Sequence, residues 1–182
     1  MKVQLFTIGH SNRSFEDFMS LLMEFQIRLI ADIRRYPGSR KFPHFNRETL
    51  AELLSVQGIQ YVWFEALGGR RHTAINEESP NTGIKSPGYR NYADHMMKDE
   101  FLTAVDELIA LGIKLKTAIM CAEKFFWRCH RRMLSDFLYG QGIAVFHILE
   151  HGTLREHKLT QGAVVTEKGL VIYPQSNNFL GV

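Results

Sequence analysis

The chain has 182 residues, 45% of them apolar and 23% charged, with a formal net charge of +3 at pH 7, which is ordinary for a soluble globular protein of one domain. No run of about 18 apolar residues occurs, so a transmembrane helix and a membrane partner are not expected. The N-terminal residues lack a signal-peptide layout and the chain has only two cysteines, so we expect a cytoplasmic protein.

Five short apolar stretches predict β-strands, at residues 3–8, 29–33, 59–64, 115–120 and 144–149. Helical spacing of apolar residues predicts a helix between each pair of consecutive strands. These helices are expected from Ser14 to about residue 25, from Asn46 to Val56, from about residue 97 to a stop at Gly112, and from just after Glu123 to about Tyr139.

The alternation of strand and helix predicts an α/β fold, namely a single domain with a mainly parallel five-stranded sheet and helices on both faces. Residues 68–90 are rich in Gly, Pro, Asn and Ser and are expected to form a long loop. Residues 163–166 and 170–173 flank Glu167-Lys168-Gly169 and predict a β-hairpin. We therefore expect an α/β domain over residues 1–160 and a hairpin and tail, residues 161–182, packed on it.

Reactive or anion-binding side chains follow four of the predicted strands. The first four parallel strands would bring these residues to one edge of the sheet, where ligands of open α/β sheets bind. The candidate site residues are His10 and Ser11, Asp32, Arg34 and Arg35, Gly68 and Gly69, Cys121 and Glu123, and, slightly later in the chain, Cys129, His130 and Arg131.

Basic residues are concentrated near this edge. Residues 28–47 contain six Lys or Arg side chains, and residues 121–132 contain four against the single acid Glu123. The loop from Ser39 to Phe45 interleaves bases with aromatic rings, a pattern that suits stacking on a nucleotide together with phosphate contact. We expect a phosphate-bearing partner, a nucleotide or a nucleic acid. The alternative is a solvated face with scattered ion pairs and inward-facing Phe rings.

Three residues are candidates for catalysis, each with a structural alternative. Cys121 ends its strand near a helix start, where a thiol can become a nucleophile, although cysteines at strand ends are usually buried in the core. Glu123 is placed to act as an acid, a base or a clamp for a ribose or amine. His10 is either a general acid or base or an ordinary packing histidine.

The second basic cluster is expected about one turn into its helix. Cys129 shares a helical face with Phe126, Met133 and Phe137, which favours packing over chemistry. Arg131 is placed either to grip a carboxylate or phosphate or to pair with Glu123. A metal site is not expected, because no CxxC motif occurs and neighbouring Cys-His pairs rarely bind one ion together. The cofactor is unknown.

These motifs, taken together, resemble the bacterial and archaeal family catalogued as domain of unknown function 488, in a longer form with a C-terminal extension. The resemblance covers about residues 3–160, and its motifs occur in the family's order. They are Thr7-Ile8-Gly9-His10-Ser11, Asp32-Ile33-Arg34 with Pro37, Ser39, Pro43 and Phe45, Leu67-Gly68-Gly69, Cys121-Ala122-Glu123, Cys129-His130-Arg131 and Val145-Phe146-His147-Ile148. The resemblance implies that the clusters belong together, but it implies no reaction.

Three functions fit the sequence. The leading hypothesis is a hydrolytic or group-transferring enzyme that acts on a nucleotide or nucleic acid, with Glu123 in catalysis and Arg34, Arg35 and Arg131 on phosphate. The second is a module that binds nucleic acid or a nucleotide without turnover. The third is cysteine-based sulfur chemistry of the rhodanese kind on Cys121.

Overall fold

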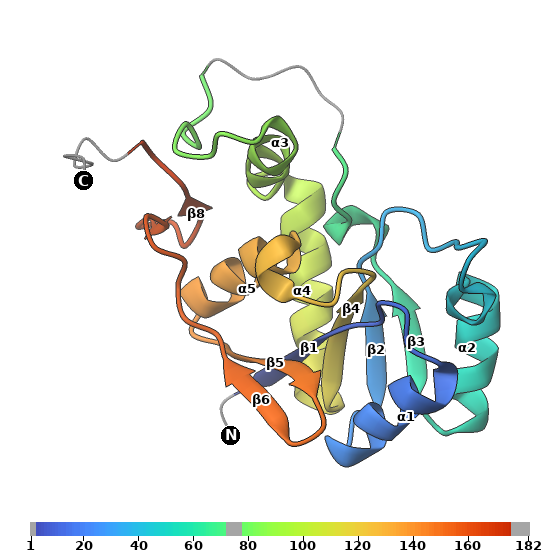
Figure 1. Ribbon diagram of the computed structural model, residues 1–182. Coiled ribbons are helices and arrows are strands. Elements are labelled where there is room, and N and C mark those ends of the chain that lie inside the picture. The colour runs from blue at the N-terminus through green and yellow to red at the C-terminus, as the bar shows by residue number, and fades with distance from the viewer. Residues whose placement is uncertain (1–2, 72–77, 176–182) are drawn as a thin grey trace.

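The computed structural model describes residues 3–71 and 78–175 (Figure 1). Its main sheet has six strands in the order β3-β2-β4-β1-β5-β6, of which the first five are parallel and β6 is antiparallel to β5. The strands are β1 (Gln4–Gly9), β2 (Leu29–Asp32), β3 (Gln60–Trp63), β4 (Thr117–Cys121), β5 (Ala144–Glu150) and β6 (Thr153–Glu156). The predicted α/β fold with a mainly parallel sheet is confirmed.

Within residues 3–71 and 78–175, five α-helices cover the two faces of this sheet (Figure 1). One hydrophobic core lies under α1 and α2, and the other lies under α3, α4 and α5. The helices are α1 (Phe15–Glu24), α2 (Arg47–Val56), α3 (Pro87–His95), α4 (Asp99–Lys114) and α5 (Arg131–Gly140). In the described part of the chain, none of the helices combines the length and apolarity that crossing a membrane would need.

The pleat of the strands explains the two cores. In β1, Leu5 points into the core beneath α4 and Phe6 points into the core beneath α1, because successive side chains of a strand face opposite sides of the sheet. All residues of the central strands β2 and β4 are buried, as expected when helices cover both faces. The apolar stretches of the sequence therefore predicted the parallel strands of the sheet correctly.

The sheet has one strand more than predicted. All four residues of β6 are exposed, so this antiparallel edge strand carries no apolar pattern that would have identified it. The hairpin at the end of the chain is confirmed as β7 (Val164–Val165) and β8 (Val171–Ile172). Val171 and Tyr173 are buried in the core beneath α5. The expected boundary at residue 160 stays a prediction, and residues 176–182 of the tail lie outside the described residues.

Two helix predictions and one loop prediction were wrong in detail. Helix α4 runs past Gly112 to Lys114, because this glycine makes room for the side chain of Leu5 rather than ending the helix. The expected loop over residues 68–90 contains the start of α3, with Pro87 in its first turn, while residues 72–77 of that loop lie outside the described part. Helix α5 begins only at Arg131, after a short 3₁₀ turn, Phe126–Arg128.

Candidate functional site

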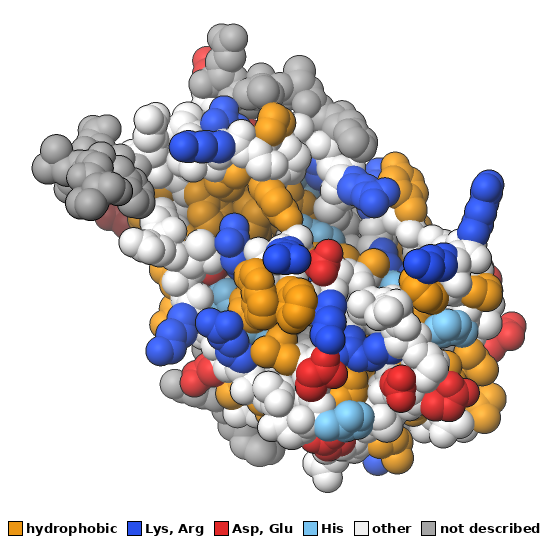
Figure 2. Space-filling view, viewed as in Figure 1, with side chains coloured by type: hydrophobic (Ala, Val, Ile, Leu, Met, Phe, Trp, Pro, Cys, Tyr) orange, Lys and Arg blue, Asp and Glu red, His pale blue; other side chains and the backbone are white. Residues whose placement is uncertain are grey.

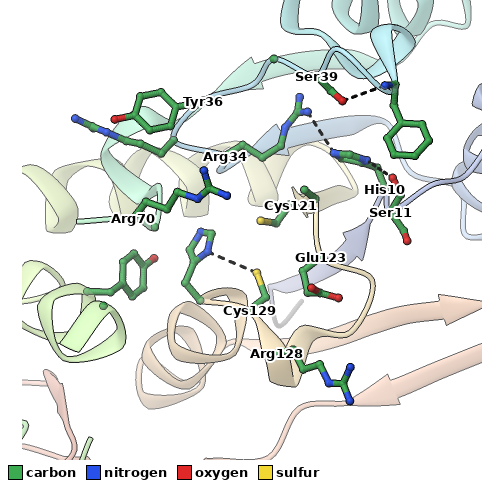
Figure 3. Close-up of a pocket in the computed structure, with 18 of the residues that line it drawn as sticks. His10, Ser11, Arg34, Tyr36, Ser39, Arg70, Cys121, Glu123, Arg128 and Cys129 are labelled. Carbon is green, nitrogen blue, oxygen red and sulfur yellow. Dashed lines mark hydrogen bonds between the residues drawn. The ribbon is translucent and has the colours of Figure 1, made fainter. Parts of the chain in front are cut away.

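A cavity of about 760 Å³ opens at the carboxyl edge of the parallel strands. Ten of the predicted site residues line it together, and they come from the segments after β1, β2, β3 and β4 (Figure 3). They are His10, Ser11, Arg34, Arg35, Ser39, Gly69, Cys121, Glu123, Cys129 and His130. Asp32, Gly68 and Arg131 lie behind the wall, where they hold the residues that line it.

The ends of β1 and β4 are joined by backbone hydrogen bonds. The N–H of His10 donates to the carbonyl of Cys121 over 3.0 Å, and the N–H of Ser11 donates to that of Ala122 over 2.9 Å. Ser11 adopts the left-handed backbone conformation, with φ of 52°, which non-glycine residues rarely do. A constrained backbone of this kind is often found at functional sites.

Asp32 is fully engaged in positioning Arg34. The Arg34 Nε donates to both carboxylate oxygens over 2.9 and 3.0 Å, and Tyr61 donates its hydroxyl to Oδ2 over 2.6 Å. Both side chains of the ion pair are buried. Asp32 and Arg34 thus form a buried ion pair, which fixes the guanidinium at the cavity wall.

His10 is held by both ring nitrogens. Arg34 Nη1 lies 3.3 Å from Nε2, and because a guanidinium can only donate, Nε2 accepts and Nδ1 donates to the carbonyl of Ser11 over 2.9 Å. Burial, followed by the positive charge of Arg34, lowers the pKa of His10 to about 4. His10 also stacks on Phe45, so in this arrangement it is a neutral ring that braces the wall.

Arg131 shapes the loop that follows β4. Its side chain is buried, and its Nη2 donates to the backbone carbonyls of Glu123 and Lys124 instead of pairing with the Glu123 carboxylate. Gly9 helps to shape the same loop, because a Cβ at this position would lie 2.0 Å from the carbonyl oxygen of Glu123. Arg131 and Gly9 thus fix the loop from behind and do not face the cavity.

The two adjacent glycines serve close packing. A Cβ on Gly68 would lie 2.9 Å from the Cα of Arg35, and a Cβ on Gly69 would lie 2.8 Å from Nδ1 of His130. Only a residue without a side chain allows this approach of the segment after β3 to its neighbours. Gly69 therefore leaves open the space beside the imidazole of His130.

Cys121, Cys129 and His130 form a cluster in the wall of the cavity, and Figure 3 labels the two cysteines. Their ligand atoms all lie within 4.8 Å of one another. The Sγ of Cys129 is 3.5 Å from Nδ1 of His130, whose Nε2 is 3.2 Å from the backbone carbonyl of Ile33. His130 begins helix α5 as its N-cap, so the prediction that Cys129-His130-Arg131 lies one turn into a helix was wrong.

The two thiols differ in acidity. A hydrogen bond from the Cys121 thiol, aided by the nearby His130 and Arg131, holds the pKa of Cys129 well below its ordinary value. The same hydrogen bond, together with burial, raises the pKa of Cys121 well above its ordinary value. The contacts thus favour Cys129 as the charged sulfur, although the sequence pointed to Cys121.

Ser39 and Glu123 complete the predicted set. The hydroxyl of Ser39 accepts a hydrogen bond from the N–H of Phe42 over 3.0 Å, so it shapes the loop at the cavity mouth. Glu123 is exposed and lines the opening (Figure 3). Arg35 also faces the cavity and pairs with Glu65 over 2.9 Å.

Several residues of the cavity rim were not named as single site residues from the sequence, although Lys41 and Arg128 lie in the two basic stretches expected near this edge. They are the bases Lys41, Arg70 and Arg128 and the aromatic residues Tyr36 and Tyr89. Lys and Arg side chains surround this edge of the molecule (Figure 2). Arg70 directly follows the two glycines and has a left-handed backbone, with φ of 55°, so the glycine pair itself was the signal for it. Tyr89 lies in helix α3, which the sequence analysis missed.

Comparison with known proteins places the chain in a family. The family model described as "Domain of unknown function DUF488" matches residues 14–138, which is more than half of the chain. The chain belongs to this family. The matched region runs from the N-cap of α1 to Leu138 in the last turn of α5, and it contains every candidate residue except His10 and Ser11. No curated protein and no solved structure matches the chain.

Proposed function

We propose that this DUF488 protein is an enzyme that acts on a nucleotide or nucleic acid by hydrolysis or group transfer at the carboxyl edge of its sheet. The observation that carries the proposal is one cavity in which five basic side chains surround a cysteine-histidine cluster. The basic side chains are Arg34, Arg35, Lys41, Arg70 and Arg128. This combination supplies both an anion-binding rim and groups that can react.

The rim supports the phosphate part of the proposal. Among the described residues, no carboxylate pairs with Lys41, Arg70 or Arg128, so these charges are available to a ligand. Arg34 already uses its Nε and Nη2 on Asp32, and its Nη1 faces His10. Guanidinium groups form strong charge-assisted hydrogen bonds with phosphate.

The aromatic residues support the nucleotide part. Tyr36 is 65% exposed, and Tyr89 and Phe42 also line the cavity, so flat rings stand beside the basic side chains. An aromatic ring next to a cation suits a base next to its phosphate. Glu123 lies at the opening on the same side as Arg128, where a carboxylate can exchange a proton with a bound ligand (Figure 3).

The binding half of the proposal is tested with a fluorescent single-stranded oligonucleotide and with ADP as competitor. We expect Arg70→Ala and Arg128→Ala each to weaken binding about tenfold and to reduce the salt dependence by about one charge. The matched control is Arg28→Ala, an exposed arginine directly before β2, at the opposite edge of the sheet. Equal weakening in the control, or no binding at low salt, would contradict the proposal.

The catalytic half is tested by Glu123→Gln. We expect this variant to lose turnover of the ligand that binds, with affinity within about tenfold of the wild type, because the carboxylate acts on the transition state. Binding without turnover in the wild type would instead identify a binding module without catalysis.

A second candidate is cysteine-based sulfur chemistry, favoured by the two neighbouring sulfurs beside His130 at the cavity wall. In a sulfur carrier, the cysteine thiolate attacks the outer sulfur of thiosulfate, sulfite leaves, and a persulfide forms. Cyanide then takes the outer sulfur of the persulfide, which gives thiocyanate and restores the thiolate. If this is the function, the wild type should transfer sulfur from thiosulfate to cyanide, and Cys129→Ser should abolish this transfer. Glu123→Gln should leave it unchanged, which separates this candidate from the first.

A further inference from the structure

The Cys121–Cys129–His130 cluster is compact enough to hold a tetrahedral zinc ion. With Zn–S near 2.3 Å and Zn–N near 2.0 Å, tetrahedral ligands stand about 3.8 Å apart for two sulfurs and about 3.5 Å apart for sulfur and nitrogen. The Sγ of Cys129 is 3.5 Å from Nδ1 of His130, and all three ligand atoms lie within 4.8 Å of one another.

The local backbone explains why two neighbouring residues point the same way. Cys129 is extended, with φ of −136° and ψ of 153°, whereas His130 has helical angles of −59° and −17°. The chain therefore turns between them, and their side chains converge instead of diverging. Cys121 reaches the same point from the end of β4. The sequence argument against a metal was based on the missing CxxC motif and on neighbouring Cys-His pairs, and it did not account for this turn.

The second nitrogen of His130 is bound in the manner typical of a metal ligand. A backbone carbonyl can only accept, so Nε2 must carry the hydrogen that meets the carbonyl of Ile33, at 3.2 Å. In the neutral ring, the lone pair is then on Nδ1, which lies 3.5 Å from the Sγ of Cys129. Metal-binding histidines almost always donate their other ring N–H to a carbonyl, carboxylate or water, which fixes the ring and its tautomer.

The charges and the chemical type of the ligands select the ion. Two thiolates balance a dication, so the bound ion adds no net charge to a cavity already lined by five basic side chains. Two sulfurs and one imidazole favour zinc over magnesium or calcium, which prefer oxygen. We therefore infer that Cys121, Cys129 and His130 bind a zinc ion whose fourth coordination position opens into the cavity. Three protein ligands with an open fourth position are typical of catalytic zinc.

The zinc site is inferred independently of the proposed function, but a zinc ion here would supply the proposed enzyme with a catalytic group. A zinc ion in this place would polarise a phosphoryl oxygen of a ligand that the basic rim holds. The three ligands are also the residues of the sulfur-transfer candidate, and zinc would occupy the sulfurs which that chemistry needs. A bound zinc ion would therefore fit the first candidate function and argue against the second.

The inference is tested on the full chain without an affinity tag, stripped with a chelator and kept in a reducing buffer. On titration with cobalt(II), we expect one ion per chain, with the visible bands of a tetrahedral site and a sulfur-to-cobalt charge-transfer band, and displacement by zinc. Cys121→Ser and Cys129→Ser should each weaken uptake at least tenfold. His151→Gln, which changes a histidine that is 59% exposed and outside the cluster, should bind as the wild type does.

A second measurement on the wild type covers the case in which the serine variants fail to fold. Zinc should slow the reaction of both thiols with a thiol reagent at least tenfold. Reactivity unchanged by zinc, or less than one cobalt per two chains at saturation, would overturn the inference. Arg70→Ala should keep full metal uptake while losing oligonucleotide affinity. Loss of affinity in that variant without metal uptake in the wild type would therefore reject the zinc site and leave the proposed function standing.

Discussion

At the scale of single residues, the candidate site divides into side chains that face the cavity and side chains that place them. Asp32 positions Arg34, Arg131 holds the backbone after β4, and Gly9 lets that backbone come close to β1. None of these three lines the cavity. Their substitution should therefore disturb the site by moving it, not by removing a contact with the ligand.

Gly9→Ala tests this division. The added Cβ would lie 2.0 Å from the carbonyl oxygen of Glu123, a backbone atom that cannot rotate away. We expect a loss of at least about 2 kcal/mol in the free energy of unfolding, measured by urea denaturation. Gly38→Ala is the matched control, because Gly38 also lines the cavity but has nothing within 4 Å of the added atom. Equal stability of the two variants would contradict the close approach.

The sequence predicted the members of the site better than their orientations. Residue type and position after a strand were enough to bring His10, Arg34, Cys121 and Cys129 together. They could not show that Arg131 turns inward, because its orientation depends on where α5 begins, and that start is set by the 3₁₀ turn before it. Orientation depends on the local backbone, which composition and spacing do not determine.

At the scale of elements, buried polar contacts tie the C-terminal segment to the sheet. Asp136 of α5 is fully buried and accepts hydrogen bonds from Nε2 of His157 over 2.9 Å, the N–H of Thr160 over 2.8 Å and the hydroxyl of Tyr173 over 2.7 Å. One carboxylate thus joins α5 to the segment that follows β6 and to the residue after β8. Strand patterns predicted the hairpin, but no periodicity in the sequence predicts this carboxylate.

Tyr173→Phe removes one of these contacts and leaves the ring in place. We expect it to lower the free energy of unfolding by about 1–3 kcal/mol, because Asp136 loses a donor in a site that water does not reach. Tyr139→Phe, which changes a tyrosine that is 46% exposed, should stay within about 0.5 kcal/mol of the wild type. Urea denaturation of both variants measures the difference. A cost for Tyr173→Phe no larger than for Tyr139→Phe would show that the contact does not stabilise the fold.

At the scale of the whole molecule, a buried chain of hydrogen bonds runs from β1 through β5 to α5. Thr7 lies 2.8 Å from Nδ1 of His147, and Nε2 of His147 lies 3.0 Å from Nδ1 of His157, which reaches Asp136. Burial, followed by the charges of His157, Arg131 and Arg155, lowers the pKa of His147 to about 2. The fold therefore requires this imidazole to be neutral, and its stability becomes linked to pH.

The direction of this pH dependence follows from the pKa of His147 in the folded and the unfolded chain. In the unfolded chain His147 takes up a proton near pH 6.5, whereas in the folded chain it does so only near pH 2, so between these values the unfolded state binds more protons. The contribution of neutral His147 to the free energy of unfolding is complete above pH 6.5. It decreases as the pH falls, by about 2 kcal/mol at pH 5. His147→Gln should flatten the fall in unfolding free energy between pH 7.5 and pH 5 by this amount, while Tyr139→Phe keeps the wild-type slope. NMR provides a check that does not depend on the variant: the ring of His147 should remain neutral at pH 4.5 in the folded protein, and a protonated ring there would contradict the argument.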